Sequence, residues 1–328
     1  MPEKKSNVTA KTSASQSYDF NTFSGVFVPS VLAIFGAVMF LILPRVLGGI
    51  GLIGMILIVF IAHSVSISTA FSLSAIATNI KVKGGGLYYL ISRSLGTEFG
   101  GGLGIQLFLA QAVSIGFYLI AFAKGVQMIL AYFNIAFPEL YISLIFCLIF
   151  CIIAFKGARF VIKIQYVILV AIVLSIFSIF LGPDISSQAM GITNMPQLTF
   201  WVAFAMFFPA VVGIDAGIGM SGDLKNPKKS LVRGTFTAIF FTLILYALLT
   251  IKLAGSATLN QLFTDPNIII KLALIPGFVV AGILFATSSS ALSYFMTSPR
   301  TLKALTDDNI FPPKFKFLGM TIGNSREP

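Results

Sequence analysis

Asp215 is an acidic residue in the middle of the apolar run FWVAFAMFFPAVVGIDAGIGM, which covers residues 200–220. A charged side chain at the centre of a bilayer costs about 3 kcal/mol or more, so such residues mark ion or substrate pathways. Pro209, Gly213, Gly217 and Gly219 interrupt the helical pattern close to the acid. A broken helix beside an intramembrane acid indicates a transport site.

A second interruption lies at Gly36, within the apolar run near residues 25–48. Paired interruptions in corresponding halves of a chain are typical of inverted-repeat transporters. Each break frees backbone N–H groups on one half-helix and carbonyls on the other, which suit anions and cations respectively. We therefore expect cation ligands among the carbonyls of residues 32–35 and near Pro209. The amides expected to bind an anion are those of Gly36, Ala37, Val38, Gly213, Ile214 and Asp215.

A polar face in the last apolar run offers oxygen ligands. Ala286, Ser289 and Ser290 are spaced three and four residues apart, which places them on one side of a helix. One carbonyl and two hydroxyls there could bind a small cation. Small residues at this spacing also allow membrane helices to pack closely, so the spacing alone leaves both interpretations open.

The composition predicts an all-α integral membrane protein that holds these residues in place. The chain is 57% hydrophobic and 10% charged, and its mean hydropathy is +0.95. A span needs about 20 apolar residues. We expect eight transmembrane helices, of which the first and the sixth are broken, near residues 25–48, 51–79, 103–133, 139–155, 160–182, 199–220, 231–252 and 271–298.

The net charge of +11 does not form one basic face. Of the 22 basic residues, 18 fall in residues 4–11, 81–93, 156–163, 225–233 and 300–326, which are alternate connections between the expected spans. This pattern argues against nucleic-acid binding. It predicts that the chain spans a plasma or inner membrane with both of its ends on the cytoplasmic side. We expect a disordered tail over residues 1–22, a membrane transport domain over 23–304 and a cytoplasmic segment over 305–328 that precedes a missing remainder.

The chain lacks the residues of several other classes of protein. It has no phosphate-binding loop of the ATPase type, no cluster of metal ligands and one histidine, His63. We therefore expect no enzyme activity, no cofactor and no transition metal. His63 lies inside the second expected span, where it either relays protons or bonds to neighbouring groups such as Ser64 or Ser66.

Three runs carry a resemblance to a known family. They are the glycine-rich segment from Leu73 to Gly102, which contains KVKGGGLYYLISRS, the segments FFPAVVGIDAG and MSGDLKNPKKSLVRGT, and SSSALSYFMTSPRTLKALTDDNIFP from Ser288 to Pro312. The chain resembles the cation-chloride cotransporters after about residue 23. This resemblance implies the LeuT-like fold of the amino acid, polyamine and organocation superfamily, with two inverted repeats and sites at the breaks of spans one and six.

The resemblance also assigns ions to the residues. It implies a sodium site at the backbone of Leu32 and Phe35 with Ala286, Ser289 and Ser290. It implies a potassium site at Tyr118 and the carbonyls of Ile34 and Pro209, although Ala33 and Val212 stand where the family has asparagine and threonine. Inner chloride would bind where Asp215 stands, a position that is apolar in the family.

Asp215 therefore suggests a change of occupant. In one hypothesis it is a built-in anion that coordinates a cation or an organic ammonium group, or carries a coupling proton. We place it with Ile34, Tyr118 and Pro209 in a second cation or substrate site. In the alternative, the carboxylate pairs with a nearby hydroxyl or with a cation such as Lys124 and only supports the structure.

Three functions follow from these features. The first is secondary active, sodium-coupled symport of inorganic ions, with chloride and potassium as further candidates. The second is an amino acid or amine permease of the same superfamily. The third is a non-transporting fragment, because the family continues beyond residue 328 into further spans. Expected partners are the lipid bilayer, the transported ions or small solute, a second copy in a homodimer and a separately encoded C-terminal half.

Overall fold

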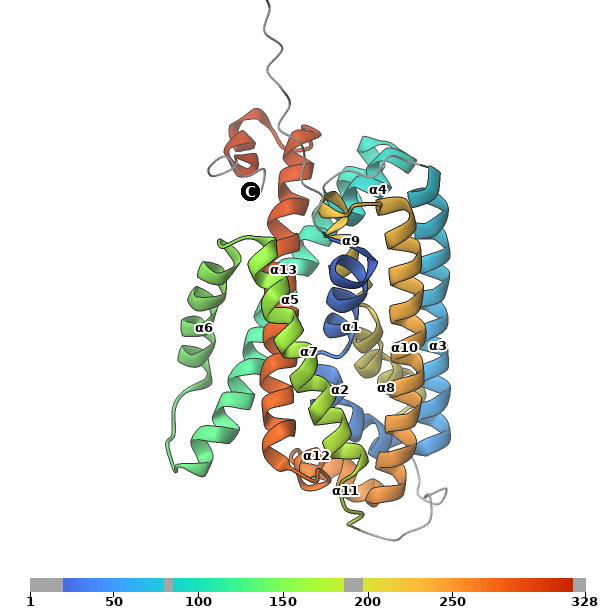
Figure 1. Ribbon diagram of the computed structural model, residues 1–328, viewed down its shortest axis with the longest axis vertical. Helices are drawn as coiled ribbons and strands as arrows, with labels where there is room; N and C mark the ends of the chain where they lie inside the picture. Colours follow the sequence, from blue (N-terminus) through green and yellow to red (C-terminus); the bar gives the residue numbers. More distant parts are fainter. Residues whose placement is uncertain (1–19, 80–84, 186–196, 321–328) are drawn as a thin grey trace, which may run out of the picture.

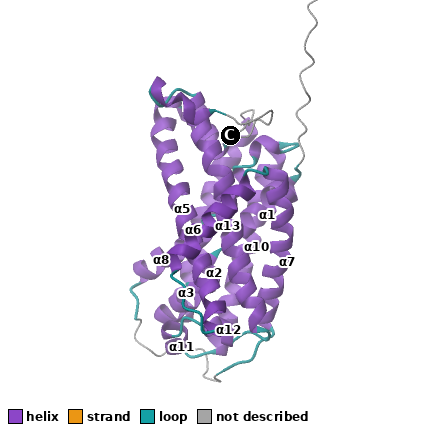
Figure 2. Ribbon diagram, turned by 90° about the vertical axis from the view of Figure 1, so that its left-hand side faces the viewer, coloured by secondary structure: helices purple, strands orange, loops and turns teal. Residues whose placement is uncertain are grey.

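Long helices dominate the structure, a computed structural model that describes residues 20–79, 85–185 and 197–320. In these ranges the helical elements are, in chain order, η1 Phe23–Phe27, α1 Val28–Ile34, α2 Ala37–Leu41, α3 Leu43–Asn79, α4 Gly86–Leu95, α5 Thr97–Tyr132, α6 Glu139–Ala154, α7 Ala158–Phe180, α8 Phe200–Phe207, η2 Phe208–Val211, α9 Ile214–Ile218, η3 Ser221–Asp223, α10 Pro227–Ser256, α11 Leu259–Thr264, α12 Ile268–Lys271, α13 Pro276–Asp307 and η4 Pro313–Gly319. Figure 2 shows no strand in these parts of the chain. The all-α membrane fold expected from the composition is thus confirmed.

Seven helical segments in the described ranges are long and apolar enough to span a membrane: Phe23–Leu41, Leu43–Asn79, Thr97–Ala131, Phe160–Phe180, Phe200–Asp223, Pro227–Ser256 and Pro276–Asp307. The fourth expected span, residues 139–155, forms α6, which has 16 residues. At 1.5 Å per residue α6 is about 24 Å long, short of the roughly 30 Å of a hydrocarbon core. The eighth span therefore stays a prediction.

The first span is the central helix of the bundle. In its most apolar window 89% of the residues are buried, against 28% for the span Thr97–Ala131. Figure 1 shows α1 between α7 and α13 on one side and α10 on the other, and α1 contacts all three. A helix that is apolar on every side belongs in such a position because it has no polar face to expose. The break in the first span is therefore surrounded by protein and not by lipid.

The end of the first span differs slightly from the expectation. The helix resumes at Leu43 as α3, which runs to Asn79. Gly51 lies inside α3 with φ 79° and ψ 170°, a conformation that favours glycine, and it separates a short leading segment from the second span. The turn at Gly51 thus lies at the boundary between the expected spans 25–48 and 51–79.

Residues 20–22 lie within the expected disordered tail, yet the structure describes them. Phe20 forms a parallel bridge with Leu224. Its N–H donates to the carbonyl of Asp223 at 3.2 Å, and its carbonyl accepts from the N–H of Lys225 at 2.9 Å. The start of the chain is therefore joined to the segment after the sixth span. Residues 1–19 lie outside the described residues.

One end of the bundle, which we call the basic end, contains α4, the start of α10 and the end of α13 (Figure 1). Gly85 and Gly86 have φ values of 108° and 58°, so they make the tight turn that begins α4. A Cβ on Gly86 would lie 3.1 Å from the Cα of Gly219, which shows how closely α4 approaches the segment after α9. The glycine-rich run therefore shapes a turn and a close contact.

Asp308 joins α4 to the end of α13. Its carboxylate forms an ion pair with Arg93 at 2.6 Å, and it accepts hydrogen bonds from the hydroxyls of Tyr88 at 2.9 Å and Ser92 at 3.4 Å. Burial, followed by the hydrogen bond to Asp308, raises the pKa of Tyr88 to about 12. The tyrosine hydroxyl therefore stays protonated and can donate at any physiological pH.

Three basic residues at the opposite end, which we call the outer end, have partners. Lys252 pairs with Asp184 at 2.8 Å, Lys271 pairs with Asp265 at 2.6 Å, and the guanidinium of Arg45 lies 5.4 Å from the ring centroid of Phe263. The hydrogen bond from Lys252 lowers the pKa of Asp184 and so favours the charged form of this carboxylate. Positive charge at the outer end is thus partly compensated.

We expect Asp308→Asn to lower the free energy of unfolding by about 1–2 kcal/mol, because it removes an ion pair and weakens two hydrogen bonds at a mostly buried acceptor. The check is the midpoint of thermal unfolding in detergent. Asp307→Asn is the matched control, since Asp307 is 60% exposed and pairs only along its own helix with Lys303 at 3.4 Å. Equal shifts in both variants would contradict a joining role for Asp308.

Candidate functional site

The two broken helices meet at their breaks. α1 ends at Ile34, Phe35 leaves the helix with φ −80° and ψ 30°, and Gly36 is extended with ψ −158° before α2 begins. In the sixth span the helix is interrupted at Gly213, before α9. A Cβ built on Gly213 would lie 2.7 Å from the carbonyl carbon of Ala33 and from the N atom of Ile34. The predicted pair of breaks is therefore confirmed, and the two lie in direct contact.

Tyr246 of α10 supplies a partner for the carbonyl of Ile34. Its hydroxyl donates to that oxygen at 2.9 Å, and the side chain is completely buried. The tyrosine ring packs against Phe35 and Phe207, with centroids 5.8 Å and 5.3 Å apart. One expected cation ligand of the second site thus already accepts a hydrogen bond from the protein.

The serine face of α13 lies beside the break in the first span. A Cβ on Gly36 would lie 3.0 Å from the hydroxyl oxygen of Ser290. Ser290 donates to the carbonyl of Ala286 at 3.1 Å. Ser289 is completely buried, and its hydroxyl has no hydrogen-bond partner among the described residues. Leu32 and Phe35 are also buried, at the end of α1.

The hydroxyl of Ser289 differs from that of its neighbour Ser288 in having no partner among the described residues. A serine that only allows close packing usually returns its hydroxyl to its own helix, as Ser288 does by donating to the carbonyl of Leu284 at 2.6 Å. A buried hydroxyl without a partner costs about 1–3 kcal/mol. The structure brings Ser290, Ala286 and the break at Gly36 together, with Ser289 on the neighbouring position of the same helix.

Asp215 occupies the first turn of α9, directly after the break. The hydroxyl of Tyr294 on α13 donates to its Oδ1 at 3.4 Å. The ring of Tyr118 on α5 stacks on that of Tyr294, with centroids 5.8 Å and planes 15° apart. Tyr118 also reaches the first break, because a Cβ on Gly36 would lie 3.1 Å from its ring. Asp215 and Tyr118 thus belong to one cluster, connected by Tyr294.

The partner of Asp215 is a hydroxyl and not a lysine. Lys124 is exposed on α5, and the described residues contain no ion pair between it and Asp215. The carboxylate also interacts with the backbone N–H groups of Asp215 and Ala216. The protein's own carboxylate therefore lies at the amides where an anion was expected, beside Gly213 and Ile214.

Other expected ligands are less clearly placed. Pro209 lies in η2 and is exposed. Ala37 and Val38 are buried in the first turn of α2. Their role in anion binding stays a prediction, as do the other ligand assignments at these breaks.

His63 does not bond to the serines that follow it. Its Nδ1 lies 2.8 Å from the carbonyl oxygen of Val59 in its own helix. Ser66 instead donates to the carbonyl of Val211, at 2.9 Å, next to the break in the sixth span. A histidine bonded to its own helix supports packing, and the ring of His63 lies 6.0 Å from that of Tyr246.

The sequence reasoning missed Tyr294 and Tyr246, although one signal could have revealed the first. Tyr294 follows Ser290 by four residues, so helical spacing places it on the serine face. Tyr246 has no comparable local signal. Its importance depends on a carbonyl 212 positions away.

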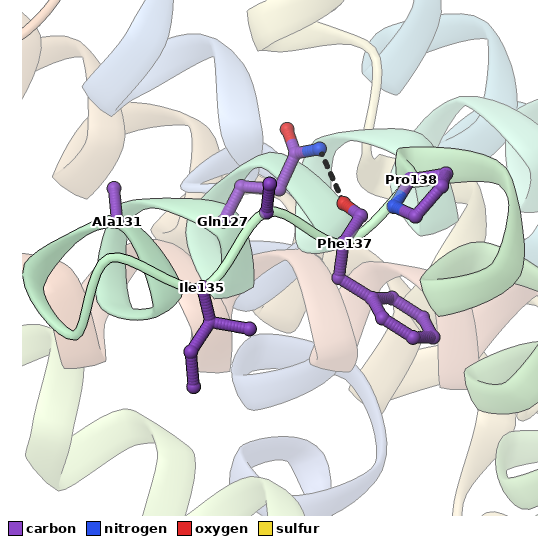
Figure 3. Close-up of a pocket in the computed structure, with 6 residues that line it drawn as sticks. Gln127, Ala131, Ile135, Phe137 and Pro138 are labelled. Atoms are coloured by element: carbon purple, nitrogen blue, oxygen red, sulfur yellow. Dashed lines mark hydrogen bonds between the residues drawn. The ribbon is translucent and has the colours of Figure 1, made fainter.

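A separate pocket lies in the connection between α5 and α6, lined by Gln127, Ala131, Ile135, Ala136, Phe137 and Pro138 (Figure 3). Gln127 closes this connection by donating to the carbonyl of Phe137 at 3.2 Å. It lies nine residues beyond Tyr118, or about 14 Å along α5. The pocket is therefore a feature of the loop and not part of the breaks.

The match to a known family covers nearly the whole chain. The family described as amino acid permease matches residues 25–328. The chain belongs to this family. Its members are transporters and not enzymes, and the match agrees with the membrane-spanning helices and the two touching breaks.

Curated relatives refine the comparison. The chain is 30% identical to solute carrier family 12 member 9 of Danio rerio, over 89% of this chain and 38% of the relative. It is 30% identical to solute carrier family 12 member 2 of Homo sapiens, over 100% of this chain and 32% of the relative. It is 31% identical to vacuolar cation-chloride cotransporter 1 of Saccharomyces cerevisiae, over 89% of this chain and 30% of the relative. The resemblance to cation-chloride cotransporters is confirmed, and the chain spans about one third of the length of these relatives.

We expect Gly213→Ala to abolish transport and to lower the free energy of unfolding by about 1–3 kcal/mol, because the added methyl group meets backbone atoms of α1. Thermal unfolding and tracer flux in proteoliposomes provide the check. Gly116→Ala is the control, since a Cβ there meets no atom within 4 Å. Normal flux in Gly213→Ala would show that the two breaks need not touch.

Proposed function

We propose that the protein is a secondary active transporter that moves inorganic ions in symport with sodium. The observation that carries this proposal is the hydroxyl of Ser289, which is completely buried and has no hydrogen-bond partner among the described residues. Ser289 directly precedes Ser290, whose hydroxyl lies next to the break at Gly36. The relatives support the proposal, since one is named as a cation-chloride cotransporter. The sequence has no phosphate-binding loop of the ATPase type, so we infer that a sodium gradient and not ATP drives transport.

The chemistry of the expected ligands suits sodium. Small hard cations prefer oxygen ligands, and the set contains hydroxyls of Ser289 and Ser290 with carbonyls of Ala286, Leu32 and Phe35. The carbonyls at the end of a half-helix also carry partial negative charge. A sodium ion would satisfy the Ser289 oxygen and would hold α13 against the first break. Binding would thereby couple the ion to the position of the broken helix.

The charge distribution supports an orientation in which the basic end faces the cytoplasm. Three basic residues of the outer end are paired with acids or a ring, as described above. Charge at the basic end includes Lys225, Lys228 and Lys229 at the start of α10. Excess lysine and arginine marks the cytoplasmic side of membrane proteins. A homodimer and a separately encoded C-terminal half stay predictions.

We expect Ser289→Ala to weaken equilibrium binding of radioactive sodium by about tenfold, which corresponds to the loss of one coordinating oxygen worth about 1.4 kcal/mol. The measurement uses purified protein in a scintillation proximity assay. Ser288→Ala is the control, because the Ser288 hydroxyl bonds to its own helix. If sodium binding is unchanged in Ser289→Ala, or absent from the unaltered protein, the proposed sodium coupling is wrong.

A second candidate function is favoured by the cluster at Asp215. A carboxylate that accepts from Tyr294 beside the stacked ring of Tyr118 would suit an organic ammonium group, through charge and cation–π contact. Asparagine and threonine side chains of the family's potassium site are replaced here by Ala33 and Val212. An amino acid or amine permease would use this cluster, while the third possibility, a fragment that does not transport, predicts no flux of either kind.

We expect Asp215→Asn to reduce transport at least about tenfold, since removing the charge loses an ion contact of 1.4 kcal/mol or more. Flux of labelled chloride, rubidium and a mixture of amino acids into proteoliposomes distinguishes the two candidates. Tyr294→Phe is the partner variant, because it keeps the ring and removes the hydroxyl. Unchanged flux in both Asp215→Asn and Asp215→Leu would leave the carboxylate with a supporting role only.

A further inference from the structure

Gln165 is a polar residue on the buried side of α7 that no proposed ligand set includes. It is completely buried. The other buried residues of this helix on the same side are mainly aliphatic: Val161, Ile162, Ile168, Ile172, Ile176 and Ile179. An amide in such surroundings is costly unless its groups have partners. A buried glutamine at this position therefore needs a physical explanation.

Half of the Gln165 amide is satisfied by α13. Its Nε2 donates to the hydroxyl oxygen of Ser293 at 3.0 Å. Its carbonyl oxygen, Oε1, is buried and has no hydrogen-bond partner among the described residues. Helices α7 and α13 pack against each other, and both contact α1 (Figure 1). The unpartnered oxygen therefore lies at the interface that also contains the serine face.

Ser293 belongs to a line of hydroxyls that begins at the expected sodium site. Ser289, Ser293, Thr297 and Thr301 follow one another at intervals of four residues, which places them on one side of α13 at steps of about 6 Å. All four are at most 3% exposed. Thr297 donates to the carbonyl of Ser293 and Thr301 to that of Thr297, both at 3.1 Å. Their oxygens keep lone pairs that a cation could use.

The line leads from the first break toward the basic end and is covered there by the sixth span. A Cβ on Gly219 would lie 3.1 Å from the Cβ of Thr297. The guanidinium of Arg300, one turn further, donates to the carbonyl of Gly219 at 3.2 Å. The segment after α9 therefore covers the line of hydroxyls on the basic-end side of Ser293. Ser289 and Gln165 lie on the outer-end side of this covered part.

We propose that the Gln165 carbonyl oxygen and the hydroxyls of Ser289 and Ser293 form a transient sodium site through which the ion leaves toward the basic end. The inference rests on the proposed sodium coupling and adds a release route with a named ligand. Ser289 Oγ and Gln165 Oε1 are buried oxygens without hydrogen-bond partners among the described residues, and they belong to two helices that pack against each other. Ser293, to which Gln165 donates, lies one helical turn from Ser289. A sodium ion that shifts by one turn exchanges the Ser289 oxygen for that of Gln165 without entering an apolar region.

A role in helix packing alone would not account for a glutamine at position 165. Packing of α7 against α13 would be served by an aliphatic residue, as at Ile168 and Ile172. A weak second site next to a tight one has a functional use, because conduction requires that an ion can leave as well as bind. Gln165 is then a positioning ligand for release and contributes little to the resting affinity.

The test compares sodium affinity with sodium exchange. Purified protein in proteoliposomes is loaded with radioactive sodium, and both equilibrium binding and the rate of exchange with external unlabelled sodium are measured. For Gln165→Met, which keeps the length of the side chain without the oxygen, we expect affinity within about twofold of the unaltered protein and exchange about tenfold slower. For Gln165→Glu, we expect tighter binding together with slower exchange, because the added charge retains the ion.

Ser175→Ala is the matched control. Ser175 lies on the same side of α7 and is completely buried, and its hydroxyl has no partner in the part of the chain that the structure describes. It lies ten residues from Gln165, or about 15 Å along the helix. We expect neither affinity nor exchange to change in it. Unchanged exchange in Gln165→Met, or parallel losses of affinity in the Met and Glu variants, would overturn the inference. Unchanged sodium binding in Ser289→Ala would instead overturn the proposed sodium coupling itself.

Discussion

Backbone groups without hydrogen-bond partners are expensive inside a membrane, and this fold concentrates them at the contact between Gly213 and the end of α1. Neither broken helix could stand alone in lipid, because each leaves N–H and carbonyl groups unpaired in mid-span. Their contact, with α7, α10 and α13 around it, replaces lipid by protein. The absence of a side chain at Gly213 is the condition for this arrangement.

The surroundings of the breaks differ in how their polar groups are satisfied. Some are satisfied permanently, as the carbonyl of Ile34 is by Tyr246 and that of Val211 is by Ser66. These hydrogen bonds tie the broken helices to α10 and α3. By contrast, the hydroxyl of Ser289, a side-chain group on α13, has no partner among the described residues.

Much of the architecture could be predicted because it depends on local properties of the chain. Apolar length indicated most spans, while Gly36 and Gly213 marked the breaks and helical spacing grouped Ser289 with Ser290. Residues that act through distant partners were harder to predict. Tyr246 and Gln165 look like ordinary members of buried helices until the structure shows Ile34 and Ser293 beside them. Phe20 was assigned to a tail because its pairing with Leu224 has no local signature.

The close approach of Gly86 to Gly219 makes α4 a link between two elements of the basic end. At its start α4 touches the segment after α9, and further along it holds the end of α13 through Asp308. α4 thus connects the segment after α9 with the end of α13 at the basic end. The segment after α9 and the end of α13 could therefore separate only if α4 lost the close approach at Gly86 or the contacts of Asp308.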